Sequence, residues 1–172
     1  MTFSAENLLI LGVVIVAAIF IAAAVTKGRY PYRKAGPLLT PAERHFIATL
    51  ELANEGRYRI CTKVRIADLV QVKKGVGGKE GIVALNRIAA KHVDYVLVEA
   101  SSWEAVAAIE LDDSSHQRGD RIARDSFVNK VFEVVNLPLL RVPAKRNYSA
   151  SELRLQIDSA IAGAAAKAAG LK

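Results

Sequence analysis

The sequence contains a single cysteine, Cys61, among its 172 residues. One cysteine cannot form an internal disulfide bond, so small disulfide-stabilised scaffolds are excluded. The chain also lacks a CxxC motif, the cysteine and histidine spacing of a zinc finger, and any internal repeat. The composition is therefore compatible with one modest domain that folds in a reducing compartment.

The glycine motifs that bind nucleotide phosphates are absent as well. Residues 72–81 hold Gly75, Gly77, Gly78 and three lysines, but neither GxxxxGK[ST] nor GxGxxG occurs in the chain. We therefore predict that this segment is a flexible connection between two elements.

Positive charge is missing from the first 26 residues, because all 24 lysines and arginines lie at or beyond Lys27. No residue between Leu8 and Val25 is charged or strongly polar. At 1.5 Å per residue this run forms a helix of about 27 Å, close to the hydrocarbon thickness of a bilayer. We predict a single-pass transmembrane anchor in residues 1–26.

A cleaved signal peptide is the alternative, with Ala22 to Ala24 as small residues near a cleavage site. However, residues 1–7 carry no lysine or arginine, whereas four cations follow the run, namely Lys27, Arg29, Arg33 and Lys34. The positive-inside rule then predicts a protein of the bacterial inner membrane whose C-terminal domain faces the cytoplasm.

The basic excess belongs to the part of the chain after the apolar run. Of the 17 acidic residues only Glu6 precedes it, so the remainder carries 24 − 16 = +8 charges. Such an excess favours a polyanionic partner, either nucleic acid or the anionic inner leaflet. Protein partners are not indicated by any motif.

Residues 27–39 contain prolines and glycines without periodicity and indicate a linker, which leaves residues 40–172 as the domain. A capping box at Thr40 to Glu43 begins the first helix, and another at Ser149 to Glu152 begins an alanine-rich C-terminal helix. Hydrophobic periodicity predicts helices at 41–55, at 80–91 and after Ile122, with strands at 58–66, 93–98, 106–112 and 139–142. This order predicts an α/β fold with a mixed sheet flanked by helices.

Three carboxylates interrupt the two apolar strands V93-D-Y-V-L-V98 and V106-A-A-I-E-L-D112. They are Asp94, Glu110 and Asp112. Burying an ionised carboxylate is costly unless it is paired, hydrogen-bonded or bound to a metal. The short loop at 100–104 favours antiparallel neighbours, and the period of two places Glu110 and Asp112 on one face. Because Mg²⁺ or Mn²⁺ prefers oxygen ligands, we predict that these acids form a metal site.

The arrangement Asp94…Glu110-Leu-Asp112-Asp-Ser-Ser-His116, with the later strand Leu139-Leu-Arg-Val142, resembles the PD-(D/E)xK nuclease superfamily. It is most similar to the branch of the very-short-patch repair endonuclease, whose signature reads E-x-D-G-x-x-H. Residues 37–157 also resemble a bacterial domain of unknown function that is sometimes fused to topoisomerase-type zinc fingers. The resemblance implies a restriction-endonuclease-like fold and Mg²⁺-dependent hydrolysis of DNA.

The same resemblance implies roles for individual residues. Asp94 and Glu110 would bind the metal with help from Asp112, His116 would act as a general acid or base, and Glu43 would be a supporting acid. The chain departs from the common motif at Asp112, where most members have lysine, and at Asp113, where the close branch often has glycine. A nuclease fold that has lost activity and only binds nucleic acid or a partner at the membrane is therefore an alternative.

Basic side chains near these acids could bind phosphate groups. We predict this role for Lys63, Arg65, Arg118 and Arg121. Each residue also has a structural alternative: Glu110 could pair with Lys63 or Arg65, and the arginines after residue 117 could simply form a solvated helix face.

Overall fold

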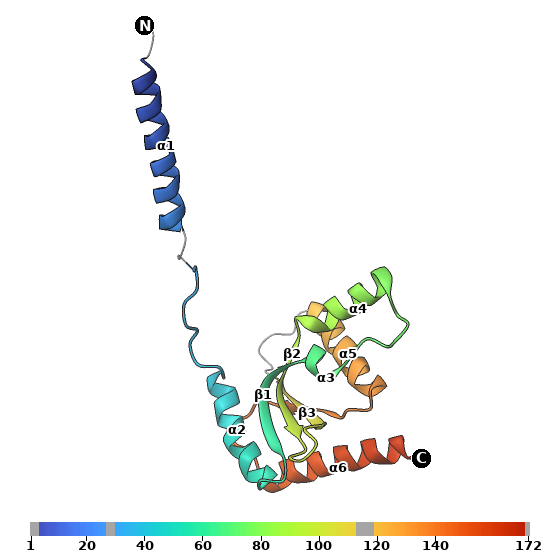
Figure 1. The fold of residues 1–172 in the computed structure, drawn as a ribbon. Helices are drawn as coiled ribbons and strands as arrows, with labels where there is room; N and C mark the ends of the chain where they lie inside the picture. Colours follow the sequence, from blue (N-terminus) through green and yellow to red (C-terminus); the bar gives the residue numbers. More distant parts are fainter. Residues whose placement is uncertain (1–3, 27–29, 113–118, 171–172) are drawn as a thin grey trace. The chain divides into compact units, whose positions relative to one another are not determined.

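The computed structural model describes residues 4–26, 30–112 and 119–170, and only the backbone of residues 25, 26 and 119–125. The chain divides into two units, Met1–Leu38 and Leu39–Lys172. Figure 1 traces both units along the chain.

The first unit contains one apolar helix, α1 (Ala5–Thr26). Residues Ala5–Ala24 have a mean hydropathy of 2.8, and none of this span is buried against other residues. Its 20 residues extend about 30 Å at the helical rise of 1.5 Å, so the helix is long and apolar enough to cross a membrane.

The second unit is a mixed α/β domain. Its elements are α2 (Pro41–Asn54), β1 (Arg59–Arg65), α3 (Ile66–Leu69), α4 (Gly78–Ala89), β2 (His92–Val98), β3 (Ala105–Asp112), α5 (Gly119–Val134), β4 (Leu139–Pro143) and α6 (Ala150–Ala168). The predicted helices and strands are all present within a few residues of their expected bounds. The short helix α3 was not predicted, because four residues are too few for a helical period to be recognised.

The capping box at the start of α2 is confirmed. Thr40 accepts a hydrogen bond from the backbone of Glu43, and the Glu43 carboxylate accepts one from the backbone of Thr40. Glu55 and Gly56 end the helix in left-handed conformations with φ of 48° and 73°.

The four strands form one mixed sheet in the order β1-β2-β3-β4. Strand β2 pairs antiparallel with both β1 and β3, and the second pairing confirms the prediction from the short loop between β2 and β3. Strand β4 pairs parallel with β3, and α5 supplies the crossover that a parallel connection requires. The predicted mixed sheet flanked by helices is therefore confirmed.

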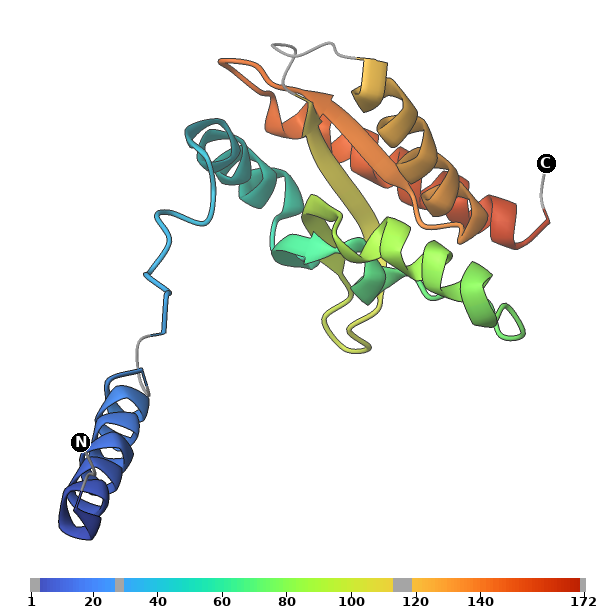
Figure 2. The same ribbon diagram turned by 90° about the horizontal axis from the view of Figure 1, so that it is seen from above.

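Helices cover both faces of the sheet (Figure 2). One face packs against α2 and α6 through a cluster that includes Phe46, Tyr95 and Ile157. The other packs against α3, α4 and α5 through a cluster that includes Val96 and Phe132. Both clusters lie entirely within residues 39–172, so this unit has a hydrophobic core of its own.

Candidate metal centre

Asp94 lies where β2 and β3 stop pairing. The last paired residues are Tyr95 and Ile109, and beyond them the Asp94 Oδ2 atom accepts a hydrogen bond of 2.9 Å from the backbone N–H of Leu111. The carboxylate thus replaces a strand carbonyl as the acceptor for a β3 amide. This contact explains how an acid is accommodated in an otherwise apolar strand.

The second oxygen of Asp94 is paired with Lys63 of β1. The Lys63 Nζ atom lies 2.9 Å from Asp94 Oδ1 and 2.7 Å from Glu43 Oε1. The side chains of Asp94 and Glu43 are only 14% and 12% exposed. Burial by itself would lower the pKa of Lys63, but the hydrogen bonds and negative charges of the two carboxylates outweigh burial and raise this pKa. Lys63 is therefore held in its charged form.

Glu43 connects this ion-pair cluster to helix α2. One carboxylate oxygen caps the helix by accepting from Thr40 N, while the other accepts from Lys63. The backbone carbonyl of Glu43 also accepts a hydrogen bond of 2.6 Å from the Tyr95 hydroxyl. Two of these contacts, from Lys63 and from Tyr95, thus fix the first turn of α2 against β1 and β2.

Lys63 has a left-handed backbone conformation with φ of 54°. Its neighbours Thr62 and Val64 pair with Tyr95 and Val93, but Lys63 itself is missing from the β1–β2 ladder. A non-glycine residue in this region costs on the order of 1–3 kcal/mol. The ion pairs with Glu43 and Asp94 help to offset that cost.

Glu110 on β3 is close to Asp94 on one side and is the register partner of Arg141 of β4 on the other. Burial, together with the charge of Asp94, raises the pKa of Glu110 to about 7 even though Arg141 acts in the opposite direction. Near neutral pH this carboxyl group is consequently divided between its protonated and ionised forms. A group in this condition is typical of a functional site.

Asp112 lies farther out and has a different partner. Its Oδ1 atom is 2.9 Å from a guanidinium nitrogen of Arg141, and its side chain is 47% exposed. The Nε atom of Arg141 donates to Asn129 Oδ1 of α5 at 2.9 Å. Arg141 therefore joins β4 to both β3 and α5 next to the carboxylates.

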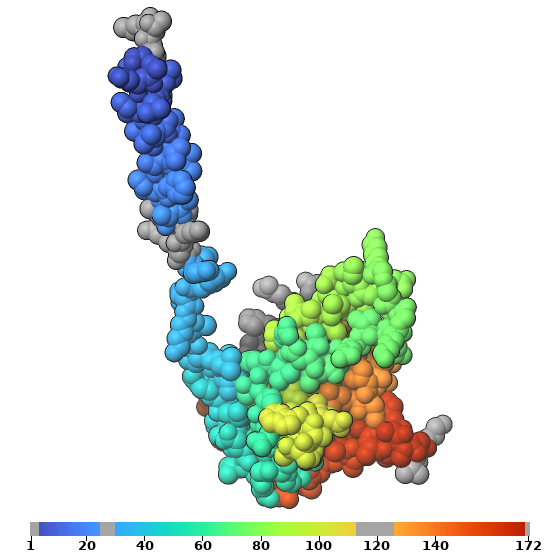
Figure 3. Space-filling model, viewed as in Figure 1, coloured from blue at the N-terminus to red at the C-terminus, as the bar shows by residue number. Residues whose placement is uncertain are grey.

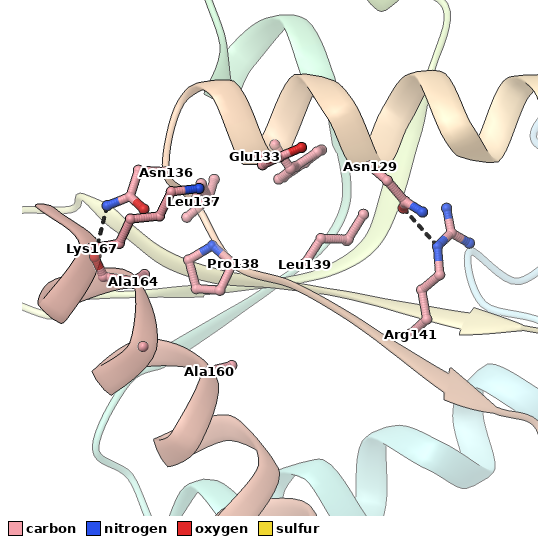
Figure 4. Close-up of a pocket in the computed structure, with 12 residues that line it drawn as sticks. Asn129, Glu133, Asn136, Leu137, Pro138, Leu139, Arg141, Ala160, Ala164 and Lys167 are labelled. Carbon is pink, nitrogen blue, oxygen red and sulfur yellow. Dashed lines mark hydrogen bonds between the residues drawn. The ribbon is translucent and has the colours of Figure 1, made fainter. Parts of the chain in front are cut away.

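A surface hollow of about 430 Å³ is lined at one end by Arg141 and Asn129 (Figure 4). Its walls come from α5, β4 and α6, and Asn136 and Lys167 line the far end. The small side chains of Ala160 and Ala164 allow the hollow to form along α6. Neither Asp94 nor Glu110 lines it, so this hollow is separate from the acidic pair.

The remaining predicted site residues are placed as follows. Arg65 makes a two-point ion pair with Asp68 and does not contact Glu110. His116 and Arg118 lie outside the described residues, and Arg121 lies in α5 at a position where only the backbone is described. The roles predicted for these residues remain predictions.

Arg141 and Asn129 are the neighbours that our sequence reasoning missed. An arginine in the apolar strand Leu139-Leu-Arg-Val142 is as unexpected as an acid in such a strand, so the same argument could have identified Arg141. Asn129 gave no signal, because an asparagine on a helix is ordinarily solvated.

Asp94 and Glu110 fit a magnesium ion by their chemistry. Mg²⁺ usually keeps several waters and is bound through one or two carboxylates, so two adjacent acids are sufficient on the protein side. Within residues 4–26, 30–112 and 119–170 there is no group of three or more histidine, cysteine, aspartate or glutamate residues able to hold a metal. The described donors are thus the carboxylates of Asp94 and Glu110. Both oxygens of Asp94 already accept hydrogen bonds, from Lys63 and from Leu111, and Asp112 is engaged by Arg141.

Comparison with known proteins gives one match. A family model described as "Protein of unknown function (DUF2726)" matches residues 35–161, which is most of the chain. No curated protein and no solved structure matches. No finding links the chain to the PD-(D/E)xK superfamily, and that resemblance remains a prediction.

Proposed function

We propose that this chain, which belongs to the DUF2726 family of proteins of unknown function, is a membrane-anchored, Mg²⁺-dependent nuclease with a restriction-endonuclease-like domain. The substrate class would be DNA, cleaved by phosphodiester hydrolysis. One observation carries the proposal: two partly buried carboxylates, Asp94 and Glu110, are adjacent at the point where β2 and β3 separate, and one has a pKa raised to about 7.

The acidic pair would bind the ion. A bound Mg²⁺ neutralises charge on a phosphodiester and lowers the pKa of a water that it holds. Lys63 donates a hydrogen bond to Asp94 and fixes its orientation, and Glu43 holds Lys63 in turn. Arg141 lies beside Glu110 and favours its ionised form, which is the form that binds a cation.

His116 would then move the proton, and Arg65, Arg118 and Arg121 would bind phosphates. Lys63 was also predicted to bind phosphate, but its ammonium is shared between two carboxylates. The proposal therefore assigns Lys63 to positioning Asp94. Asp112 would act through Arg141.

The location is part of the same proposal. Helix α1 would anchor the chain in the bacterial inner membrane, and the four cations from Lys27 to Lys34 would keep the domain in the cytoplasm. DNA is accessible on that side of the membrane.

Calorimetry of Mg²⁺ and Mn²⁺ binding to residues 36–172 tests the metal site. We expect wild type to bind, Asp94→Ala and Glu110→Ala to lose binding, and Asp68→Asn to bind as wild type does, because the hydrogen bonds of Asp68 among the described residues go to Arg65. Binding would be about tenfold tighter at pH 8 than at pH 6, since Glu110 must lose its proton first.

Cleavage of duplex and single-stranded DNA with the same variants then tests catalysis. A wild-type domain that binds no ion at millimolar concentration, even with an oligonucleotide present, would contradict the nuclease.

A nucleic-acid-binding module without catalysis is the second candidate. The observation that favours it is that Lys63 and Arg141 already place two positive charges beside Asp94 and Glu110. Such a module would bind DNA without a metal, with an affinity that falls steeply as salt is added. Metal-independent DNA binding that Asp94→Ala leaves unchanged, by a wild-type domain that binds no ion, would support the module and contradict the nuclease.

A further inference from the structure

Helix α4 has an apolar surface on its outer side. Ile88 is buried against the sheet, with only 4% exposed, whereas Ile82, Val83 and Leu85 are 62%, 50% and 48% exposed. At 3.6 residues per turn Ile82 lies between Val83 and Leu85 around the helix, so these three exposed side chains form one continuous arc, with the buried Ile88 beyond Leu85. Figures 1 and 2 both show α4 at the periphery of the domain, away from α6.

The loop that precedes α4 is held against the start of this helix. A side chain at Gly81 would come within 2.6 Å of the carbonyl oxygen of Val76, so glycine is required for this close approach. The backbone N–H of Val76 also donates to Lys73 O at 3.2 Å. The loop thus presents another exposed apolar side chain, Val76, and the exposed Lys73 and Lys74. Figure 3 shows this green segment at the surface of the domain.

We define the α4 patch as the exposed residues Val76, Ile82, Val83 and Leu85 with Lys73, Lys74 and Lys79. In the part of the chain that the structure describes, none of these three lysines forms a hydrogen bond or an ion pair with another side chain. Lys63 and Lys130, in contrast, are bound to carboxylates. The lysines of the patch are therefore available to an external anion.

We propose that the α4 patch binds the surface of an anionic lipid bilayer. This inference rests on the proposed membrane anchor, and it identifies the membrane as a second partner of the domain. Aliphatic side chains enter the boundary between headgroups and acyl chains, while lysines bind the lipid phosphates. The patch combines both features within one helix and its preceding loop.

Charge and chemistry favour lipid over the other occupants. A nucleic acid backbone would satisfy the lysines but would leave Ile82, Val83 and Leu85 exposed to water. A second copy of the patch would bring positive charges together. Residues 27–38 also allow the contact, because twelve extended residues reach about 40 Å.

Depth-dependent fluorescence quenching on the full chain in vesicles tests the proposal. The natural cysteine is removed by Cys61→Ser, and Ile82→Cys carries an environment-sensitive fluorophore. Leu155→Cys on α6 is the matched control, because Leu155 is also apolar and is 70% exposed. Vesicles contain phosphatidylcholine alone or with phosphatidylglycerol, and a nitroxide-labelled lipid is the quencher.

With phosphatidylglycerol we expect quenching at position 82 to be at least about threefold stronger than at position 155, and to fall when salt is added. Lys73→Glu, Lys74→Glu and Lys79→Glu together should reduce the signal at position 82 to that of the control. Equal quenching at both positions, or quenching that is independent of phosphatidylglycerol, would overturn the proposal.

Two results without vesicles would also overturn the proposal. One is a fluorescence shift at position 82 caused by an oligonucleotide alone, and the other is a shift that depends on protein concentration.

Flotation distinguishes failure of the patch from failure of the anchor. A chain that floats with phosphatidylcholine vesicles but shows no quenching at position 82 has the anchor without the patch. A chain that does not float overturns both.

Discussion

The acidic pair and the α4 patch depart in opposite ways from the usual distribution of side chains. Asp94 is a charged residue with a side chain only 14% exposed, whereas Ile82 is an aliphatic residue that is 62% exposed. Both arrangements are unfavourable in isolation. The difference lies in their partners: Asp94 has its partners inside the domain, while the apolar side chains of the patch are 42% to 62% exposed.

This difference predicts different effects for substitutions in the two regions. Changes to the acidic pair should alter the free energy of unfolding of the domain, because its partners are internal. Changes to the α4 patch should leave that free energy nearly unchanged and alter binding instead. The predictions below concern residues 36–172, which include the whole hydrophobic core.

Asp94→Ala should have the largest effect. It leaves Lys63 with one carboxylate partner and removes the acceptor of the Leu111 amide, so we expect a loss of about 3–4 kcal/mol in the free energy of unfolding. Urea unfolding measures this value. The lysine-to-glutamate changes of the patch are the control and should cost less than about 0.5 kcal/mol. Equal losses in the two variants would remove the distinction between the regions.

The difference in stability between two substitutions within α4 should be nearly as large as the loss caused by Asp94→Ala. Ile88→Ala creates a cavity under the helix and should cost about 2–3 kcal/mol. Ile82→Ala removes a side chain that is already exposed and should cost less than about 0.5 kcal/mol. If Ile82→Ala unfolds at a clearly lower urea concentration than wild type, the Ile82 side chain is packed within the domain and is not available to a bilayer.

The pH dependence of stability should reveal Glu110. Because its pKa rises from 4.5 to about 7 on folding, the folded state retains a proton that the unfolded chain has lost at intermediate pH. Its contribution is most favourable below pH 4.5, declines as pH rises through about 7, and is constant above. Relative to Glu110→Gln, wild type should lose about 2 kcal/mol between pH 4 and pH 8, after a reduction for partial exposure.

Unfolding curves at a series of pH values measure this slope. Glu133→Gln is a suitable control, because Lys130 lowers the pKa of Glu133 and so gives its contribution the opposite sign. Parallel curves for wild type and Glu110→Gln would show that Glu110 titrates normally.

Asp112→Asn should have a small effect on stability. Its ion pair with Arg141 is 47% exposed on the aspartate side, and exposed pairs contribute less than about 1 kcal/mol. Mg²⁺ binding should persist in this variant. Complete loss of binding in calorimetry would instead make Asp112 a ligand in its own right.

The elements of the domain could be predicted because their signals are local. Thr40 and Glu43 mark the start of α2 within the sequence itself, and the apolar run around Asp94 identifies β2. The partners of the acids could not be predicted, since they depend on strand register. We considered pairing of Glu110 with Lys63 or Arg65, but Lys63 instead binds Asp94 and Arg65 binds Asp68.

The left-handed conformation of Lys63 is another feature without a local signal. Lysine has no intrinsic preference for it, and tertiary contacts with two carboxylates impose it. The position of Arg141 beside Glu110 likewise depends on the parallel pairing of β3 with β4. These two residues are 31 positions apart in the sequence, so no local pattern connects them.

The late position of β4 in the chain also determines how far the domain can be shortened. A polypeptide that ended before Leu139 would expose the backbone of β3 along the full edge where β4 normally pairs. An open edge of this kind recruits strands from other molecules, so such fragments should aggregate. Ending after Pro143 would close the edge but would remove Leu153 and Ile157, which are buried against the sheet. Expression of a soluble protein should therefore require α6 at least as far as Ile157, and shorter products should accumulate as insoluble material.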